Sequence, residues 1–202
     1  PKREGYTFEG WSGTDIKEKD TQVTITARPL KDRTYTANWK ENSYTIVFNV
    51  EGEVTRGEMK NIPLRYTQET TIPKNGYVCG GYKFVGWRTG GKKSEQKVYQ
   101  PGDKVSRLCA TNNGTVNLYP IWEPCEYTIT FDYQTGNKRE KVTCKYKETY
   151  TFPTVNRLGW TFEGWSRSAG STNVISYAPN VKTAVFEDDT ASILYTVYKP
   201  IT

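Results

Sequence analysis

The length, composition and charge of this 202-residue chain exclude several classes of protein. Aromatic residues make up 14% of the chain, with 15 Tyr and 6 Trp, whereas disordered chains are poor in aromatic and β-branched residues. Because the chain has no histidine, it lacks the usual general base and the commonest zinc ligand, which excludes Ser-His and Cys-His nucleophiles. We expect small β modules whose few large aromatic side chains supply most of the buried area.

The net charge of +6 would favour an acidic partner, such as a glycan, a wall polymer, a membrane surface or nucleic acid. The basic residues are spread along the chain, however, and the densest pairs, Lys92-Lys93 and Lys138-Arg139, fall in Gly-rich or turn-like segments where solvated charge is expected. No run approaches the roughly 18 apolar residues of a membrane span. We predict no nucleic-acid partner and no transmembrane segment, and we expect targeting elements to lie outside this stretch, which starts without a Met.

An eight-residue motif recurs three times along the chain. It is GYTFEGWS at residues 5–12, GYKFVGWR at 81–88 and GWTFEGWS at 159–166. The tryptophans that end it, Trp11, Trp87 and Trp165, are 76 and 78 residues apart. Self-similarity at such a period is the signature of tandem modules.

Two further motifs mark where each repeat starts and ends. A closing motif occurs at residues 35–39 (YTANW), 118–122 (LYPIW) and 194–198 (LYTVY), and a starting motif occurs at 44–48 (YTIVF) and 127–131 (YTITF). These motifs predict a partial module at residues 1–42 and full modules at 43–124 and 125–202. The first has no starting motif, so we expect it to be marginal alone unless residues before Pro1 complete it or a neighbour covers it.

Within each full repeat, apolar residues alternate with polar ones, as in half-buried strands. In the opening strands, the residues expected to point inward are Tyr44, Ile46, Phe48 and Val50, and Tyr127, Ile129, Phe131 and Tyr133. A second strand of a hairpin is predicted at Ile62, Leu64 and Tyr66, and at Val142, Cys144 and Tyr146. The closing strand places Leu118, Pro120 and Trp122 on one face, matching Tyr35, Ala37 and Trp39, with Asn113-Gly114 as a hairpin turn before it. Only residues 94–98 and 181–186 could form a turn or two of helix.

The glycines of the recurring motif have a structural interpretation. Gly5, Gly81 and Gly159 each precede an aromatic residue that we expect to point inward. The second glycine of each motif (Gly10, Gly86 and Gly164) directly precedes the tryptophan and is expected to permit a β-bulge, so that the indole folds across the core. A carbohydrate-stacking tryptophan is the functional alternative.

These motifs resemble the Listeria-Bacteroides repeat, found as the B repeats of internalin-type surface proteins. The resemblance extends to residues 89–91, 99–102 and 113–115, which fall where that family carries further Gly-containing motifs. It implies a compact β-grasp-like module in tandem, export to the bacterial cell surface, and a role as a spacer or adhesive stalk. The departures are four cysteines, the Cys79-Gly80 insertion, and Tyr198 in place of a closing tryptophan.

Few residues suggest chemistry. Glu9 and Glu163 occupy one repeat position, but Val85 fills it in the third copy, which favours a solvent-facing strand position. The acidic run at residues 187–189 is either a calcium site or a solvated turn. The aromatic and basic content could serve nucleic-acid stacking, but its recurrence at inward positions favours a core. We therefore predict no catalytic, cofactor-binding or metal-binding residue, and the sequence identifies no binding residue.

The four cysteines differ in their repeat positions. Cys144 takes the place of Leu64 and is interpreted as a core thiol, and Cys125 opens its repeat. Cys79 and Cys109 lie in one repeat, where a disulfide would suit an exported protein, although the sequence leaves the pairing of the four open. Without a CxxC motif, a metal or redox role is not expected.

The sequence therefore predicts a mainly β fold, α+β at most, of tandem small modules with little or no helix, and the resemblance implies that these modules are β-grasp-like. We expect a non-catalytic, extracellular segment of a bacterial cell-surface protein that needs no cofactor. It would act as a stalk or spacer with multivalent adhesion. The alternative is a dedicated binding module for cell-wall or host glycans or for a host surface protein. The short junctions at residues 40–42 and 123–125 predict limited freedom between modules.

Overall fold

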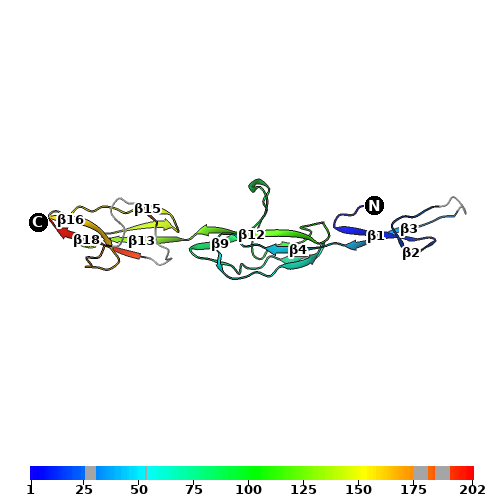
Figure 1. Ribbon diagram of the computed structural model, residues 1–202, viewed down its shortest axis with the longest axis horizontal. Helices are drawn as coiled ribbons and strands as arrows, with labels where there is room; N and C mark the ends of the chain where they lie inside the picture. The colour runs from blue at the N-terminus through cyan, green and yellow to red at the C-terminus, as the bar shows by residue number, and fades with distance from the viewer. Residues whose placement is uncertain (26–30, 53, 175–181, 185–191) are drawn as a thin grey trace. The chain divides into compact units, whose positions relative to one another are not determined.

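A computed structural model describes residues 1–25, 31–52, 54–174, 182–184 and 192–202 (Figure 1). The described residues form eighteen β-strands and one short 3₁₀ turn, Lys93–Glu95. The predicted mainly β fold is confirmed, and the β-grasp-like arrangement stays a prediction. Contacts divide the chain into two compact units. The first contains Pro1–Val78 and Phe84–Ile121, and the second contains Cys79–Lys83 and Trp122–Thr202.

The first unit begins with a three-stranded antiparallel sheet. Its order is β2-β1-β3, with β1 at Tyr6–Gly13, β2 at Ile16–Asp20 and β3 at Tyr35–Glu41. The recurring motif and the closing motif of the first repeat thus form the neighbouring strands β1 and β3. Among the described residues before Ser43, no large apolar side chain is fully buried, as expected of a repeat that lacks its starting strand.

A five-stranded sheet follows, in the order β10-β9-β12-β4-β6. Its strands β4, β9 and β12 are labelled in Figure 1. Its strands are β4 (Ser43–Phe48), β6 (Ile62–Arg65), β9 (Tyr82–Thr89), β10 (Val98–Tyr99) and β12 (Gly114–Pro124). Two short ladders accompany it: β5 (Val54–Arg56) with β8 (Val78–Cys79), and β7 (Thr70–Thr71) with β11 (Lys104–Val105).

The second unit contains a four-stranded sheet, in the order β14-β13-β18-β16. Its strands are β13 (Glu126–Asp132), β14 (Arg139–Lys145), β16 (Trp160–Ser166) and β18 (Ser192–Pro200). A short antiparallel ladder joins β15 (Thr149–Thr151) to β17 (Lys182–Ala184). The opening hairpins predicted from the alternating pattern are confirmed, because β4 pairs antiparallel with β6 and β13 with β14.

In both full repeats the starting strand pairs in parallel with the closing strand. Phe48 of β4 lies opposite Leu118 of β12, and Phe131 of β13 lies opposite Leu194 of β18. The predicted hairpin at Asn113-Gly114 is therefore wrong. Asn113 has a φ of 57° and lies in a turn, but β12 then runs parallel to β4, whereas β11, the strand before this turn, pairs with β7.

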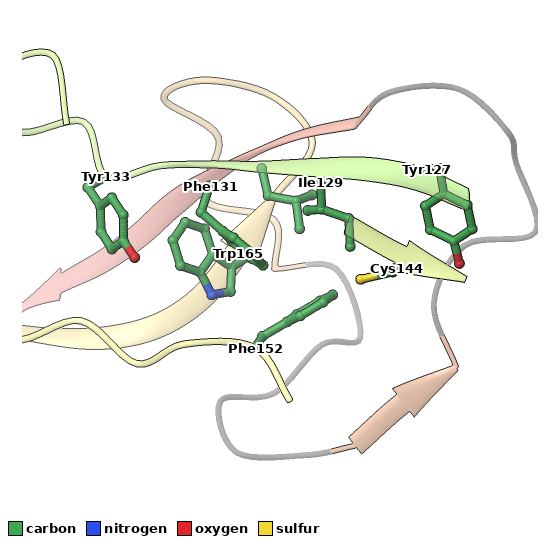
Figure 2. Close-up of a cluster of buried hydrophobic side chains, with 8 residues drawn as sticks. Tyr127, Ile129, Phe131, Tyr133, Cys144, Phe152 and Trp165 are labelled. Carbon is green, nitrogen blue, oxygen red and sulfur yellow. The ribbon is translucent and has the colours of Figure 1, made fainter. Parts of the chain in front are cut away.

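The core of the second unit is built on one tryptophan (Figure 2). Trp165 is fully buried, and its ring meets Phe131 edge-on at 4.7 Å between centroids, while its Nε1 donates a hydrogen bond to the carbonyl of Pro153 at 3.0 Å. In the first unit, buried Trp87 meets Phe48 in the same way at 4.8 Å. The interpretation of these recurring aromatic residues as core is confirmed.

Three local predictions need correction. Val50 is 61% exposed rather than inward, because β4 ends at Phe48 and the alternation ends with it. Trp160 is 36% exposed and does not belong to the core. Residues 182–184 form β17 rather than a helical turn, and the rest of that candidate segment lies outside the described residues, whereas the candidate at residues 94–98 contributes to the 3₁₀ turn.

The glycine before each tryptophan acts as predicted in two repeats. The register between β1 and β3 shifts between Phe8 and Gly10, and the register between β16 and β18 shifts between Phe162 and Gly164. Both glycines have a positive φ, 125° and 142°, which a β-carbon would strain. The bulges turn the tryptophan toward the core, because an extra residue changes which face the following side chains occupy.

Candidate functional site

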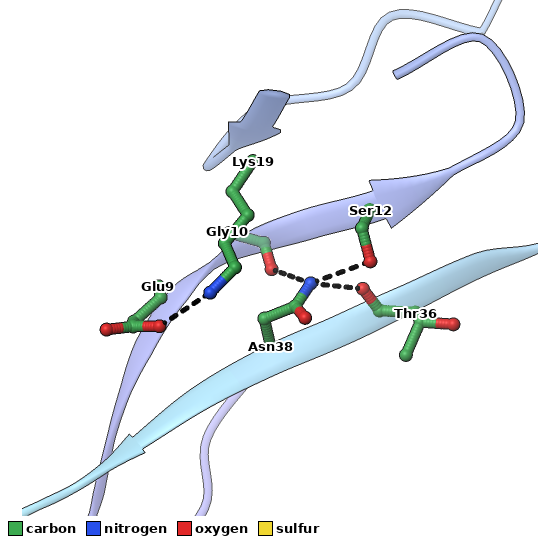
Figure 3. A network of polar contacts seen from close by, with 6 residues as sticks. All are labelled: Glu9, Gly10, Ser12, Lys19, Thr36 and Asn38. Carbon is green, nitrogen blue, oxygen red and sulfur yellow. Dashed lines mark hydrogen bonds and ion pairs between the residues drawn. The ribbon is translucent and has the colours of Figure 1, made fainter. Parts of the chain in front are cut away.

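The carboxylates that repeat between modules are surface groups. Glu9 is exposed on β1 and forms an ion pair with Lys19 at 2.9 Å (Figure 3). The hydrogen bond and the positive charge of Lys19 lower the pKa of Glu9. Glu163 is exposed on β16. The interpretation of both as solvent-facing strand residues is therefore confirmed.

A polar network that the sequence did not reveal fixes the first bulge. The Nδ2 atom of Asn38 donates hydrogen bonds to the carbonyls of Gly10 and Thr36, both at 3.1 Å, and to Ser12 Oγ at 2.9 Å (Figure 3). The amide side chain thus satisfies backbone oxygens at the position where the ladder is interrupted. Asn38 thereby links β3 to β1 across the bulge.

The calcium candidate at residues 187–189 lies outside the described residues. Within the part of the chain that the structure describes, no group of three or more His, Cys, Asp or Glu side chains could hold a metal ion. No helix there is long and apolar enough to cross a membrane.

All four cysteines are free thiols, so the disulfide considered for Cys79 and Cys109 is not formed. Cys144 is buried beside Ile129 and Phe152 in the core of the second unit (Figure 2), and burial raises the pKa of its thiol. Its interpretation as a core thiol is confirmed. Cys79 is also buried, whereas Cys109 and Cys125 are partly exposed.

The most specific contacts outside the cores occur where one repeat ends and the next begins. In the first unit, the backbone amide of Asn42 donates a hydrogen bond to the carbonyl of Gly5 at 2.9 Å. The backbone amide of Tyr66 donates one to the backbone carbonyl of Asn42, also at 2.9 Å. The Tyr66 ring lies directly on Gly5, because a β-carbon there would stand 2.0 Å from a ring atom. Tyr6 meets Tyr66 edge-on at 6.3 Å. We call this set of contacts the first joint.

The same contacts recur within the second unit, as the second joint. The amide of Cys125 donates to the carbonyl of Gly81 at 2.8 Å, and the amide of Tyr146 donates to the carbonyl of Cys125 at 2.9 Å. A β-carbon on Gly81 would stand 2.4 Å from the ring of Tyr146, which meets Tyr82 edge-on at 5.2 Å. Equivalent positions in successive repeats thus use one geometry.

Polar side chains reinforce the first joint. Glu41 accepts hydrogen bonds from both the hydroxyl and the amide of Thr67, and these bonds lower the pKa of Glu41. The side chain of Asn42 accepts a hydrogen bond from the Thr7 hydroxyl at 2.5 Å and donates one to the carbonyl of Ala110 at 2.7 Å. Cys125 replaces Asn42 in the second joint, which therefore lacks the amide contacts.

The joints correct one prediction from the sequence. Tyr6 and Tyr82, expected to point into a core, are half-buried at the joints, where they contact Tyr66 and Tyr146. For Tyr66 and Tyr146, the alternating pattern predicts only that they are inward strand residues. The signal for the joint was nevertheless present, because both tyrosines follow the second strand of a hairpin and both partner glycines precede an aromatic residue.

The second unit also carries an aromatic and basic surface groove. Arg157 lies 4.8 Å from the Trp160 ring centroid and 5.4 Å from that of Tyr198. A groove of about 280 Å³ lies against these residues, with Gln134 and Thr196 among its other walls. The side-chain Nε2 atom of Gln134 donates a hydrogen bond to the carbonyl of Thr196 at 2.6 Å. The groove is therefore lined by both polar and aromatic side chains.

Family models match most of the chain. The divergent InlB B-repeat domain matches residues 2–43, and the Listeria-Bacteroides repeat domain matches residues 44–119 and 127–190. The matches cover all three copies of the recurring motif, both starting motifs and the closing motif at residues 35–39. They end at residue 119, within the second closing motif, and at residue 190, before the third.

Proteins of Evansella cellulosilytica and Listeria monocytogenes are similar to this chain. A protein described as a Gly-rich membrane protein of Evansella cellulosilytica is 26% identical over 94% of this chain and 24% of its own length. A second membrane protein of that organism is 26% identical over 90% of this chain and 26% of its own length. Internalin H of Listeria monocytogenes is 32% identical over 46% of this chain and 16% of its own length.

The chain thus spans about a quarter of the two Evansella relatives. The recurring aromatic motif, the bulge before its tryptophan and the two family models agree on one assignment. The chain belongs to the Listeria-Bacteroides repeat family of surface proteins, and its first residues match the divergent InlB B-repeat domain.

Proposed function

We propose that this chain is a non-catalytic spacer in an extracellular bacterial surface protein, with weak multivalent adhesion as a secondary role. Its modules would be residues 1–42, 43–124 and 125–202. Membership of a surface-protein repeat family and the likeness to internalin H support the location. The absence of histidine supports the lack of catalysis.

The observation that carries the spacer role is the repeated joint. In each joint one residue, Asn42 or Cys125, forms two backbone hydrogen bonds. Its backbone amide donates to the carbonyl of the joint glycine, and its carbonyl accepts from the backbone amide of the tyrosine after the next hairpin. Backbone hydrogen bonds of this kind, closed over by an aromatic ring, restrict rotation where a flexible linker would leave it free. A spacer needs such restriction to hold a distal domain away from the surface.

A distance measurement tests this role. The four cysteines of the full chain are first replaced, and spin labels are then placed at Lys17 and Lys60, which are both exposed. Pulsed electron resonance reports the distance between the two labels, which lie on either side of the first joint. We expect one narrow distribution, which Gly5→Ala broadens because the new methyl group displaces the Tyr66 ring. Gly159→Ala is the matched control, since Gly159 has a similar φ (78° against 75°) and open space at its β-carbon. A broad distribution in the unaltered chain would refute the spacer role.

The alternative is a dedicated glycan-binding module, and the groove at Arg157, Trp160 and Tyr198 favours it. A partly exposed indole beside hydrogen-bonding side chains suits a sugar ring. A glycan array at low and physiological salt discriminates the two. Binding that survives physiological salt and is lost in Trp160→Ala would replace the spacer proposal, whereas binding abolished by salt would leave the basic charge incidental.

A further inference from the structure

The last repeat carries every element of a joint except the tyrosine that closes it. Gly159 occupies the place of Gly5 and Gly81, and its φ of 78° matches their 75° and 74°. The amide of Ile201 donates to the carbonyl of Gly159 at 3.0 Å, as the amides of Asn42 and Cys125 do to their glycines. Ile201 therefore occupies the position in the last repeat that Asn42 and Cys125 occupy in the two joints.

The surface around Gly159 is open. A β-carbon on Gly159 would meet no described atom within 4 Å, whereas at Gly5 and Gly81 it would strike a tyrosine ring. The apolar residues around it are correspondingly exposed: Leu158 fully, Ile201 by 65% and Trp160 by 36%. By contrast, Asn42, the counterpart of Ile201, is only 6% exposed.

From this register we propose that Gly159, Trp160 and Ile201 form a docking surface for the opening hairpin of a further repeat module joined in series. The hairpin would place a tyrosine, equivalent to Tyr66 and Tyr146, over Gly159. The amide of that tyrosine would donate to the Ile201 carbonyl, and Trp160 would meet its ring edge-on, as Tyr6 and Tyr82 meet theirs.

The arginine beside this surface does not block it. Arg157 lies 4.8 Å from the centroid of Trp160, and Arg3 lies in the same register, 3.8 Å from the centroid of Tyr6. The first joint is closed although Arg3 is present. The stacked arginine is therefore compatible with an occupied joint.

A second copy of this chain does not supply the occupant. Its two opening hairpins carry Tyr66 and Tyr146, and both rings already cover a glycine within their own chain. The partner is therefore a module with an uncovered opening hairpin. This inference rests on the geometry of the two joints, as the spacer role does, but failure of a further module to dock would leave the spacer role intact.

The test extends the full chain after Thr202 with a second copy of residues 127–202. This fusion keeps the register, because Pro200-Ile201-Thr202 then precedes the copied Tyr127 as Pro124-Cys125-Glu126 precedes the original. Amide hydrogen exchange is measured at the copied Tyr146. We expect its amide to exchange about 100-fold more slowly than an exposed amide, as in a formed backbone hydrogen bond.

The controls separate docking from folding. Exchange at the copied Ile129 reports whether the appended module folds, and if it does not, a copy of residues 44–124, with its Tyr66, takes its place. Gly159→Ala should abolish protection of the copied tyrosine amide while leaving the original Tyr146 amide protected. Three glycines inserted after Thr202 should have the same effect, because they break the register.

Three results would overturn the proposal. The copied tyrosine amide could exchange freely in a folded appended module, or its protection could survive Gly159→Ala. Alternatively, the unextended chain could self-associate with burial of Trp160, which would make a second copy the occupant. Fast exchange at the original Tyr66 and Tyr146 amides would instead refute the joints themselves, and with them the spacer role.

Discussion

The ring of Tyr146 lies against the α-carbon of Gly81, so closely that a β-carbon there would stand 2.4 Å from three ring atoms. Only glycine fits at this position, for two independent reasons: the ring occupies the side-chain space, and the φ of 74° disfavours any side chain. Because Tyr66 and Gly5 repeat the relationship, the recurring Gly-aromatic pair serves contacts between repeats rather than the core.

Replacing the glycine should therefore cost more at a closed joint than at the open one. We expect Gly81→Ala to lower the free energy of unfolding by about 1 kcal/mol for the strained φ and by a further ~1–3 kcal/mol for overpacking against Tyr146. Gly159→Ala has the strain without the clash and should cost only about 1 kcal/mol. Denaturant unfolding of both variants measures the difference, and equal losses would contradict the account.

The buried tryptophan should dominate the stability of the second unit. Trp165→Ala removes a fully buried ring that contacts Phe131, Tyr133 and Phe162, and we expect a loss of about 3–5 kcal/mol. Trp160→Ala, at an exposed position, should cost about 1 kcal/mol or less. Thermal or denaturant unfolding followed by circular dichroism compares the two. A larger loss at Trp160 would place the core elsewhere.

Alkaline pH should destabilise the second unit through Tyr133. Burial, together with the hydrogen bond that its hydroxyl donates to Glu140 at 2.5 Å, raises the pKa of Tyr133 to about 12. The unfolded chain ionises near its ordinary pKa of about 10, so the stabilisation is complete below pH 10 and is lost as the pH rises toward 12. Tyr133→Phe should be less stable at pH 8 but should lose stability less steeply above pH 10. An unchanged slope would show that Tyr133 does not titrate in this range.

Thiol reactivity should follow burial. Cys79 and Cys144 are buried, and burial raises the pKa of the Cys144 thiol, so both should react slowly with iodoacetamide. The partly exposed Cys109 and Cys125 should be labelled first. Mass spectrometry of peptides from a time course resolves the order. Early labelling of Cys144 would contradict its place in the core.

Much of the module follows from its pattern, because alternation with a period of two assigns the faces of β4 and β13, and the spacing of the tryptophans reveals the repeat. The parallel pairing of β4 with β12 did not follow, since the register between distant strands depends on tertiary contacts that no local pattern encodes. Asn113-Gly114 has the chemistry of a hairpin turn, yet here it precedes a strand whose parallel partner lies about 70 residues earlier.

The joints were hidden for a related reason. Tyr66 follows the inward alternation of its strand, and its ring is indeed buried, but partly by a glycine from the preceding repeat. The alternating pattern of a single repeat looks the same for a residue buried in its own core and for a residue buried against a neighbouring repeat. Likewise, Trp160 occupies an aromatic position in the motif yet stays exposed, because in the described structure no tyrosine covers it. Repeat contacts can be distinguished from core contacts only when neighbouring copies are compared.

Amide hydrogen exchange at Tyr66 and Tyr146 in the unaltered chain tests the central claim most directly. Both amides donate to the carbonyl of a joint residue, Asn42 or Cys125, and a bond that persists in solution slows exchange. We predict rates within about tenfold of those of core amides such as that of Ile129. Rates equal to those of exposed turn amides, with the core amides still protected, would show that the repeats fold without docking and would contradict the account.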